Sequence, residues 1–599
     1  MKYIAKHQSL NGFADHRHLV WVLLLVAAIV QLPPLLCGFE LCDSGFYMTF
    51  YDNIFTHPEA VEYNFMYYLS GLAGGVVSAV TAGSVLAIRI FGAVCNVACV
   101  WLAYDMVRRW GRVARQRGSA VFVPVLLSVL IIGTASWSAP LAFYNDTLTV
   151  LLAMVSLRLL CVALVPEVDG DRTVRCRLLI LLFSGIVAGV NAFSRLPNIL
   201  EVFFVCLLLL APARALAAGG CGRWRASLVW LGGWLGGVAA VLALAAALGH
   251  IPVLENMVHD LVVTVASPAG ASSHGFSHLL SALVGSWYAV GRTALPLLLI
   301  YVVHLRWHSL LVNILTACVV VWLLLRVDVL TAIAAVSVSG AVAGLVRFRG
   351  AGRTILWSVL AMLAILPLGS DNGFYNFGAV IFWLSLPVSF AVFGRRLVPL
   401  SLVVTVCLVC GGVRSLVVGG MYFDDTPLSE MTGSINSPSA AGIRTSPERA
   451  RRVNAMVSAV RRHVAPGDTL LVYGSAPMLN HLTATVPAIG CSWPELLTPG
   501  LLDHKLGAAD APANVLLLRF RTLGSEWGSG SDAFMAGDSV SANLFHNPEK
   551  SGIMLAYLSS GRYYVVEKDS DFILFSRRDS VSHDGLSGRA GWLLKSDGP

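Results

Sequence analysis

The chain of 599 residues is 56% hydrophobic and only 13% charged. Because soluble domains carry about 25% charged residues, this composition excludes a soluble protein and predicts a polytopic α-helical membrane protein. The formal charge of +8 does not indicate a nucleic-acid partner, since the basic residues lie in short loops and no basic-aromatic pattern accompanies them.

Apolar segments of about spanning length follow one another through the first two thirds of the chain. We predict about thirteen spans, at 19–38, 84–107, 120–138, 147–165, 178–194, 197–217, 227–248, 286–305, 309–326, 328–346, 354–369, 377–393 and 397–418. No small-residue cleavage pattern follows the first segment, so we expect it to remain as an anchor. The pattern predicts a transmembrane domain at 1–418 and a second domain at 419–599.

Basic residues mark one side of this transmembrane domain. The main clusters are Lys2, Lys6 and Arg17 before the first span, five arginines at 108–117 after the second, and Arg347, Arg349 and Arg353 after the tenth. With alternating crossings they all fall on one side, which the positive-inside rule makes cytoplasmic. We expect a cytoplasmic N-terminus and an extracytoplasmic C-terminus, in a bacterial plasma (inner) membrane.

An acidic pair, Glu40 and Asp43, directly follows the first predicted span. In a helix their side chains would share one face, with Cβ atoms about 5–6 Å apart. Carboxylates this close shift each other's pKa, which suits a general base or a metal site. The alternative is that these acids only mark the first solvated turn after a span.

The acidic pair opens a long first external loop, 39–83. Its apolar side chains recur at helical spacing, namely Phe46, Tyr47, Phe50, Tyr51, Ile54 and Phe55, with acids between them. This pattern predicts an amphipathic helix lying in the membrane interface, with its aromatic rings at headgroup depth. A helix with a purely structural role is the alternative.

Three short turns predicted on the same external side are rich in acids and amides. They are Tyr144-Asn145-Asp146, Ser194-Arg195 and Ser370-Asp371-Asn372-Gly373. Polar groups held by helix ends at a membrane mouth are suited to building a site. Each has a structural alternative: Asp146 as the N-cap of a span, Arg195 as a headgroup anchor, and Asp371-Asn372 as a plain turn.

A second external segment, 249–285, carries histidines and acids. Glu255/His259 and His274/His278 are i, i+4 pairs, a spacing that metal ligands use, but no HExxH motif occurs. Residues 266–273 form a flexible-loop pattern, which favours a mobile segment that gates substrate access. The sequence therefore leaves a divalent metal open.

The composition changes after about residue 420, where charged and turn residues return. Ser446-Pro447 begins a predicted helix that ends at about His463, and strands are predicted at 469–473, 514–518, 563–566 and 572–575. This alternation predicts an extracytoplasmic α/β domain, followed by a polar tail beyond about residue 579. The turn at Gly474-Ser475 is neither a P-loop nor a dinucleotide fingerprint, so no nucleotide cofactor is expected.

This layout resembles the GT-C superfamily of integral membrane glycosyltransferases. The features that carry the resemblance are the acid after the first span, the loop 39–83, external turns such as Tyr144-Asn145-Asp146-Thr147, and the C-terminal α/β domain. It is most similar in layout to the polyprenyl-phosphate-sugar-dependent protein mannosyltransferase and aminoarabinose transferase type, over about 1–418. Those relatives often carry adjacent acids or Asp-x-Asp, where this chain has Glu40-x-x-Asp43.

The resemblance implies transfer of a sugar from a polyprenyl-phosphate-linked donor, among membrane lipids, to a glycan, lipid or protein acceptor. It implies Asp43 as general base with Glu40 as a second acid, and Arg195 at the lipid phosphate. Asn145, Asp146, Asp371 and Asn372 are the further candidates for substrate binding. The competing class is a transporter or flippase of lipid-linked sugars. Transporters concentrate ionisable groups at the midplane, often within repeated halves, whereas here the acids cluster at one mouth.

Overall fold

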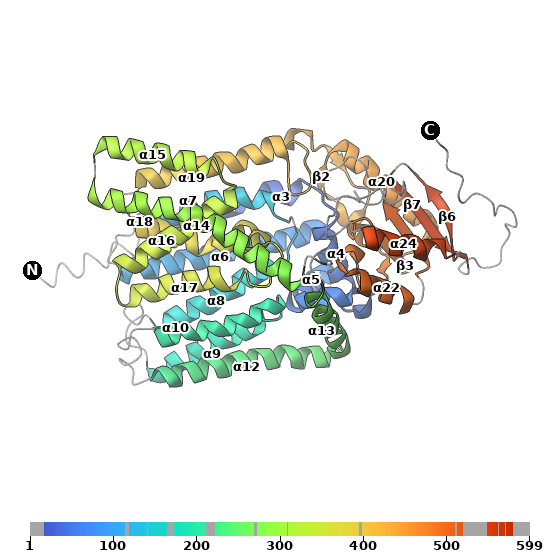
Figure 1. Cartoon of the computed structure of the whole chain (residues 1–599), viewed down its shortest axis with the longest axis horizontal. Helices are drawn as coiled ribbons and strands as arrows, with labels where there is room; N and C mark the ends of the chain where they lie inside the picture. Colours follow the sequence, from blue (N-terminus) through green and yellow to red (C-terminus); the bar gives the residue numbers. More distant parts are fainter. Residues whose placement is uncertain are drawn as a thin grey trace, which may run out of the picture.

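The computed structural model describes residues 17–113, 119–140, 142–164, 173–210, 222–268, 272, 274–307, 309–394, 398–508, 512–518, 548–560, 562–569 and 571–578. Most of the chain is a bundle of helices that run roughly along the long axis of the molecule. The strands gather in one domain at the end of the bundle opposite the N-terminus (Figure 1). This is the predicted fold class, a helical membrane bundle with a C-terminal α/β domain.

The bundle and its connections contain α2 (Arg17–Val30), α3 (Leu32–Leu36), α4 (Asp43–Asn53), η1 (Pro58–Tyr67), α5 (Tyr68–Val80), α6 (Val85–Val113), α7 (Ser119–Ala135), η2 (Ser136–Ser138), α8 (Asn145–Leu164), α9 (Val174–Asn191), η4 (Leu196–Phe204), α10 (Val205–Leu210), α12 (Arg223–Ala247), α13 (Ile251–Val265), α14 (Phe276–Arg306), α15 (Leu310–Leu324), α16 (Val329–Arg347), α17 (Ala351–Ile365), η5 (Gly373–Trp383), α18 (Ser385–Phe393), α19 (Val398–Arg414) and the π-helical η7 (Ser415–Gly419).

Seven helices of the described chain are long and apolar enough to cross a membrane, and the pair η5 and α18, bent by 61°, would make an eighth. Five further apolar helices are shorter than 18 residues. The helix α2 in the first predicted span is one of these short helices. It ends early because Pro33 and Pro34 at the start of α3 lack the N–H groups that would continue it. Each predicted span contains a helix, but the number of crossings stays a prediction.

The helix predicted in the first external loop is present, but its predicted location in the membrane interface is wrong. Helix α4 does form in the first external loop, but it is buried on nearly all sides rather than on one face. Its aromatic rings pack against one another and against η1, with Phe50 and Phe65 5.7 Å apart at their centroids. Of the apolar residues in the pattern, Phe55 alone is exposed, at 42%. Neighbouring protein therefore covers the rings that we expected lipid to cover.

The C-terminal domain contains η8 (Leu428–Glu430), β1 (Gly433–Ser434), η9 (Pro438–Ala440), β2 (Arg444–Thr445), α20 (Pro447–His463), β3 (Thr469–Tyr473), α21 (Met478–Thr483), β4 (Val486–Pro487), η10 (Pro494–Leu496), α22 (Pro499–Ala508), β5 (Asn514–Leu518), α24 (Pro548–Ser559), β6 (Tyr563–Lys568) and β7 (Phe572–Arg577). Five strands form a mixed sheet in the order β4-β3-β5-β7-β6, in which β3 is parallel to β4 and β5. The strands β5, β7 and β6 pair antiparallel.

The elements predicted for this domain are confirmed. Ser446 is the N-cap of α20, and its side chain accepts a hydrogen bond from the backbone N–H of Arg449 at 3.1 Å. The four predicted strands correspond to β3, β5, β6 and β7. The predicted polar tail beyond about residue 579 lies outside the described residues.

The domain packs directly on the end of the bundle where α4 lies (Figure 1). The backbone N–H of Met478, at the start of α21, donates to the carbonyl of Leu41 at 3.0 Å. The Thr49 hydroxyl donates to the carbonyl of Pro477 at 2.9 Å. Helix α4 is therefore held between the apolar bundle and the C-terminal domain, and the candidate site lies beside it.

Candidate active site

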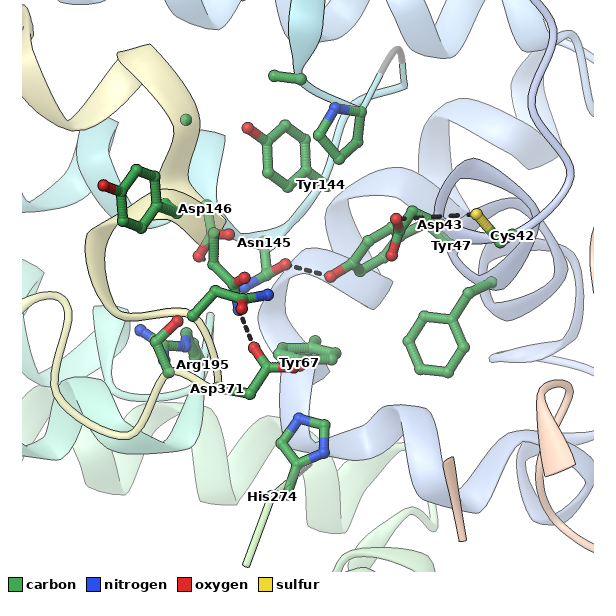
Figure 2. A pocket seen from close by; sticks show the side chains of 18 of the residues that line it. Cys42, Asp43, Tyr47, Tyr67, Tyr144, Asn145, Asp146, Arg195, His274 and Asp371 are labelled. Carbon is green, nitrogen blue, oxygen red and sulfur yellow. Dashed lines mark hydrogen bonds between the residues drawn. The ribbon is translucent and has the colours of Figure 1, made fainter. Parts of the chain in front are cut away.

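A cavity of about 1000 Å³ lies where the bundle meets the C-terminal domain. Six of the seven candidate residues line it, namely Asp43, Asn145, Asp146, Arg195, Asp371 and Asn372. The first five of them are labelled in Figure 2. The six residues come from four separate places in the chain, and helix ends and turns present all of them at the same end of the bundle. The seventh candidate, Glu40, does not line the cavity.

Asp43 is the first residue of α4 and borders the cavity. Its Oδ2 accepts a hydrogen bond from the Tyr422 hydroxyl at 2.5 Å. Burial, and next the negative charge of Glu40, raise the pKa of Asp43 to about 7, although the Tyr422 hydrogen bond acts in the opposite direction. A carboxyl with this pKa exchanges its proton near neutral pH, as a general base must.

Glu40, in contrast to Asp43, contacts the backbone of α4 and not the cavity. Its Oε1 accepts a hydrogen bond from the backbone N–H of Ser44 in the first turn of α4, and the residue is only 1% exposed. The predicted helical spacing between Glu40 and Asp43 is wrong, because α4 begins at Asp43 and residues 38–42 are not helical. The two carboxyls therefore interact through their charges but do not face the same cavity.

Asn145 and Asp146 form the first turn of α8. The Tyr47 hydroxyl of α4 donates to Oδ1 of Asn145, and Nδ2 of Asn145 donates to Oδ1 of Asp146 at 2.9 Å (Figure 2). Both residues are buried, at 3% and 6% exposure. The alternative that Asp146 is the N-cap of this span is wrong, since the helix already begins one residue earlier.

Arg195 is the single arginine or lysine among the described residues that line the cavity. It is 5% exposed, which does not fit a headgroup anchor at the surface. Its Nη1 donates to the carbonyl of Leu366 at 2.8 Å, and its guanidinium lies 5.1 Å from the centre of the Phe377 ring. Within the described part of the chain no carboxylate lies within 4.0 Å of it, so its charge has no ion-pair partner there.

Asp371 and Asn372 lie in the turn that precedes η5, and both line the cavity. Figure 2 shows Asp371 beside Arg195. Nδ2 of Asn376 donates to Oδ1 of Asp371, which orients that carboxylate. Gly373, with φ of +60°, turns the chain sharply after them. The turn that the sequence predicted is present, and its side chains also face the cavity.

Several cavity residues were missed at the sequence level. Tyr422 follows the last helix of the bundle, and nothing local in the sequence connects it to Asp43. Asp328 and Tyr375 also line the cavity, where the Tyr375 hydroxyl donates to Oδ2 of Asp328 at 3.1 Å. Asp328 had a usable signal, because it is an acid at the start of a predicted span, 328–346, on the predicted external side.

The histidine-containing segment contributes one wall of the cavity. Leu261 and Val265 of α13 and His274 line it, and burial lowers the pKa of His274. Part of the predicted flexible loop, 269–271 and 273, lies outside the described residues. Among those that are described, no three His, Cys, Asp or Glu side chains are grouped closely enough to hold a metal ion.

No family model and no curated protein matches the sequence. The fold is similar to an oligosaccharyltransferase from Archaeoglobus fulgidus in complex with Zn and sulfate (12% identity, 82% of this chain and 67% of that chain, TM-score 0.43). It is also similar to ArnT from Cupriavidus metallidurans bound to undecaprenyl phosphate (13%, 94% and 99%, 0.41). A third is the Archaeoglobus fulgidus oligosaccharyltransferase AglB with an inhibitory peptide and a dolichol-phosphate (12%, 83% and 69%, 0.44).

These proteins are GT-C glycosyltransferases, the superfamily that the sequence layout resembles.

Proposed function

We propose that this chain is a membrane glycosyltransferase that moves a sugar from a polyprenyl-phosphate-linked donor to an extracytoplasmic glycan, lipid or protein acceptor. One observation carries the proposal. A carboxyl group with a pKa of about 7, Asp43, and a buried arginine with no carboxylate partner among the described residues, Arg195, border the same cavity. This pair provides a base for the acceptor and a fixed positive charge for the leaving group.

The donor fits the cavity in two ways. A buried guanidinium is costly unless an anion compensates it, and its planar fork matches the oxygens of a phosphate. The cavity lining also includes apolar residues of the bundle, namely Ala135 of α7 and Val329 and Leu330 of α16. A lipid phosphate would place its charge at Arg195 and its first prenyl units between these helices.

The proposed reaction needs one proton transfer and one bond exchange. Asp43 takes the proton of the acceptor hydroxyl while the acceptor oxygen attacks the anomeric carbon of the sugar. The bond from that carbon to the phosphate oxygen breaks, and its electron pair leaves with the polyprenyl phosphate, where Arg195 offsets the charge. Asn145, Asp146, Asp371 and Asn372 are placed to bind sugar hydroxyls.

The cavity end of the bundle is proposed to be extracytoplasmic. Helix α8 begins at the cavity with Asn145, and near its other end Arg158 pairs with Asp105 at 2.9 Å. Arg108 and Arg109 pair with the same carboxylate at 2.8 Å. Basic residues thus collect away from the cavity, which makes that end cytoplasmic under the positive-inside rule. A bacterial plasma membrane is the proposed location.

The test is transfer by the purified protein in lipid nanodiscs, with undecaprenyl-phosphate hexoses and pentoses as donors. Asp43→Asn should lower turnover by about 10²–10⁴-fold while donor binding is retained. Asp425→Asn removes an exposed acid outside the cavity and should remain active. Near-full activity of Asp43→Asn would show that another group is the base. A flippase would move the donor without releasing free undecaprenyl phosphate, so the assay separates the two classes.

A further inference from the structure

A short turn after the last helix of the bundle, residues 421–424, contacts the segment that carries Asp43. The turn is closed by two backbone hydrogen bonds, from Met421 N–H to the Asp424 carbonyl at 3.0 Å and from Asp424 N–H to the Met421 carbonyl at 3.1 Å. Phe423 has a φ of +49°, a region that side-chain-bearing residues rarely adopt. Such a conformation persists where surrounding contacts enforce it, and these positions cluster at functional sites.

The turn holds both ends of the stretch from Phe39 to Asp43. At one end, Oδ2 of Asp424 accepts the backbone N–H of Phe39 at 3.0 Å, and Arg449 donates to the Phe39 carbonyl at 3.0 Å. At the other end, the Tyr422 hydroxyl donates to Oδ2 of Asp43 at 2.5 Å. Asp424 is fully buried, so this anchorage is shielded from water. The path from Phe39 to the carboxylate is therefore fixed by residues of the C-terminal part of the chain.

We propose that Tyr422 is a positioning residue, which holds one oxygen of the Asp43 carboxylate, leaves the other for the acceptor proton, and sets the pH at which Asp43 becomes a base. This inference rests on the proposed function of Asp43. It extends that proposal, because it makes the segment after the bundle part of the catalytic apparatus.

Several titratable groups around Asp43 influence its pKa, and Tyr422 is one of them. The titratable groups that face it are Glu40 and Cys42 on its own segment, Tyr47 of α4, Tyr67 of η1, Tyr144 before α8, Asp371 before η5, and Tyr422. Burial and the charges of Glu40 and Asp371 raise the pKa of Asp43, whereas the Tyr422 hydrogen bond lowers it. Burial and the Asp43 charge also raise the pKa of Tyr422, which keeps that hydroxyl protonated as a donor.

Removal of the Tyr422 hydroxyl should raise the pKa of Asp43. A hydrogen bond to the charged form of a carboxyl group favours that form, and Tyr422→Phe removes this hydrogen bond. The acidic limb of the kcat/KM profile should move to higher pH by about 1 unit. Starting from a pKa of about 7, activity at pH 6 should fall about tenfold relative to the unchanged protein, and the two profiles should converge above about pH 9.

The matched control is Tyr375→Phe. It also removes one tyrosine hydroxyl from this cavity, but that hydroxyl is bonded to Asp328 instead of Asp43. The midpoint of the acidic limb should stay where it is in this variant, whatever happens to the rate. An opposite displacement is expected when Tyr422 is replaced by 3-fluorotyrosine, because a more acidic phenol is a stronger donor and favours the carboxylate at lower pH.

A second measurement does not depend on activity. Infrared titration of the full-length protein in nanodiscs can follow the carboxylic C=O band of Asp43, assigned by its loss in Asp43→Asn. The band should persist to higher pH in Tyr422→Phe. Equal midpoints in the unchanged protein, Tyr422→Phe and the fluorotyrosine variant would overturn the inference, as would a loss of rate that is uniform with pH. An active Asp43→Asn would overturn the proposed base instead, and the infrared result would still decide the role of Tyr422.

Discussion

The contact between α4 and α21 joins the bundle to the C-terminal domain, and Gly45 is the residue that allows it. A Cβ placed on Gly45 would lie 2.2 Å from the backbone nitrogen of Met478. Since carbon contacts are favourable at about 3.5–4.0 Å, Gly45→Ala would require α4 and α21 to separate by more than about 1 Å. The obstacle is backbone, so no change of rotamer can relieve the clash.

The energetic terms partly oppose each other. Replacing a helical glycine by alanine favours the helix by about 1 kcal/mol. Overpacking costs about 1–3 kcal/mol, and loss of the hydrogen bond from Met478 N–H to the Leu41 carbonyl costs about 1 kcal/mol more. We expect a net destabilisation of about 1–3 kcal/mol. Because a displacement of 1 Å can cost about 10²-fold in rate, transfer should fall by about 10–100-fold.

The assay is thermal unfolding in nanodiscs together with the transfer rate from an undecaprenyl-phosphate sugar. The control is Gly552→Ala in α24, an exposed helical glycine whose added Cβ would meet no atom within 4 Å. That variant should be as active as the unchanged protein and slightly more stable. If Gly45→Ala behaves like Gly552→Ala in both measurements, the close approach of α21 to α4 does not position the site.

Three further predictions concern the donor, the charge beside the base, and the orientation. Arg195→Lys should raise the KM for the lipid-linked donor about 10-fold or more, because an ammonium group cannot replace the bidentate fork; an unchanged KM would remove Arg195 from donor binding. Glu40→Gln removes a negative charge that raises the pKa of Asp43, so the acidic limb of kcat/KM should move to lower pH, and a move to higher pH would contradict this account. Alkaline phosphatase fused after Arg578 should be active and fused after Arg349 inactive, whereas the reverse pattern would invert the proposed topology.

Much of the fold follows from local patterns in the sequence. Apolar runs identify the helices of the bundle because a lipid-facing or buried helix needs a continuous apolar surface. The start of α20 could be placed from Ser446 and Pro447 alone, since a cap is a contact between neighbours in the chain. Six candidate residues could be found for a related reason, because a helix end or short turn between apolar runs has to emerge at one face of the bundle.

Tertiary structure decided which groups the candidate residues contact. The partner of Asp43 is Tyr422, 379 positions away, and no local pattern predicts a hydrogen bond between such distant residues. Glu40 does not line the cavity, because the backbone before α4 is not helical and its carboxyl is directed toward Ser44. The aromatic pattern of α4 showed that its rings avoid water, but burial by lipid and burial by protein leave the same pattern. Only the packing of the C-terminal domain on the bundle distinguished the two, and the same packing closes the cavity around Asp43.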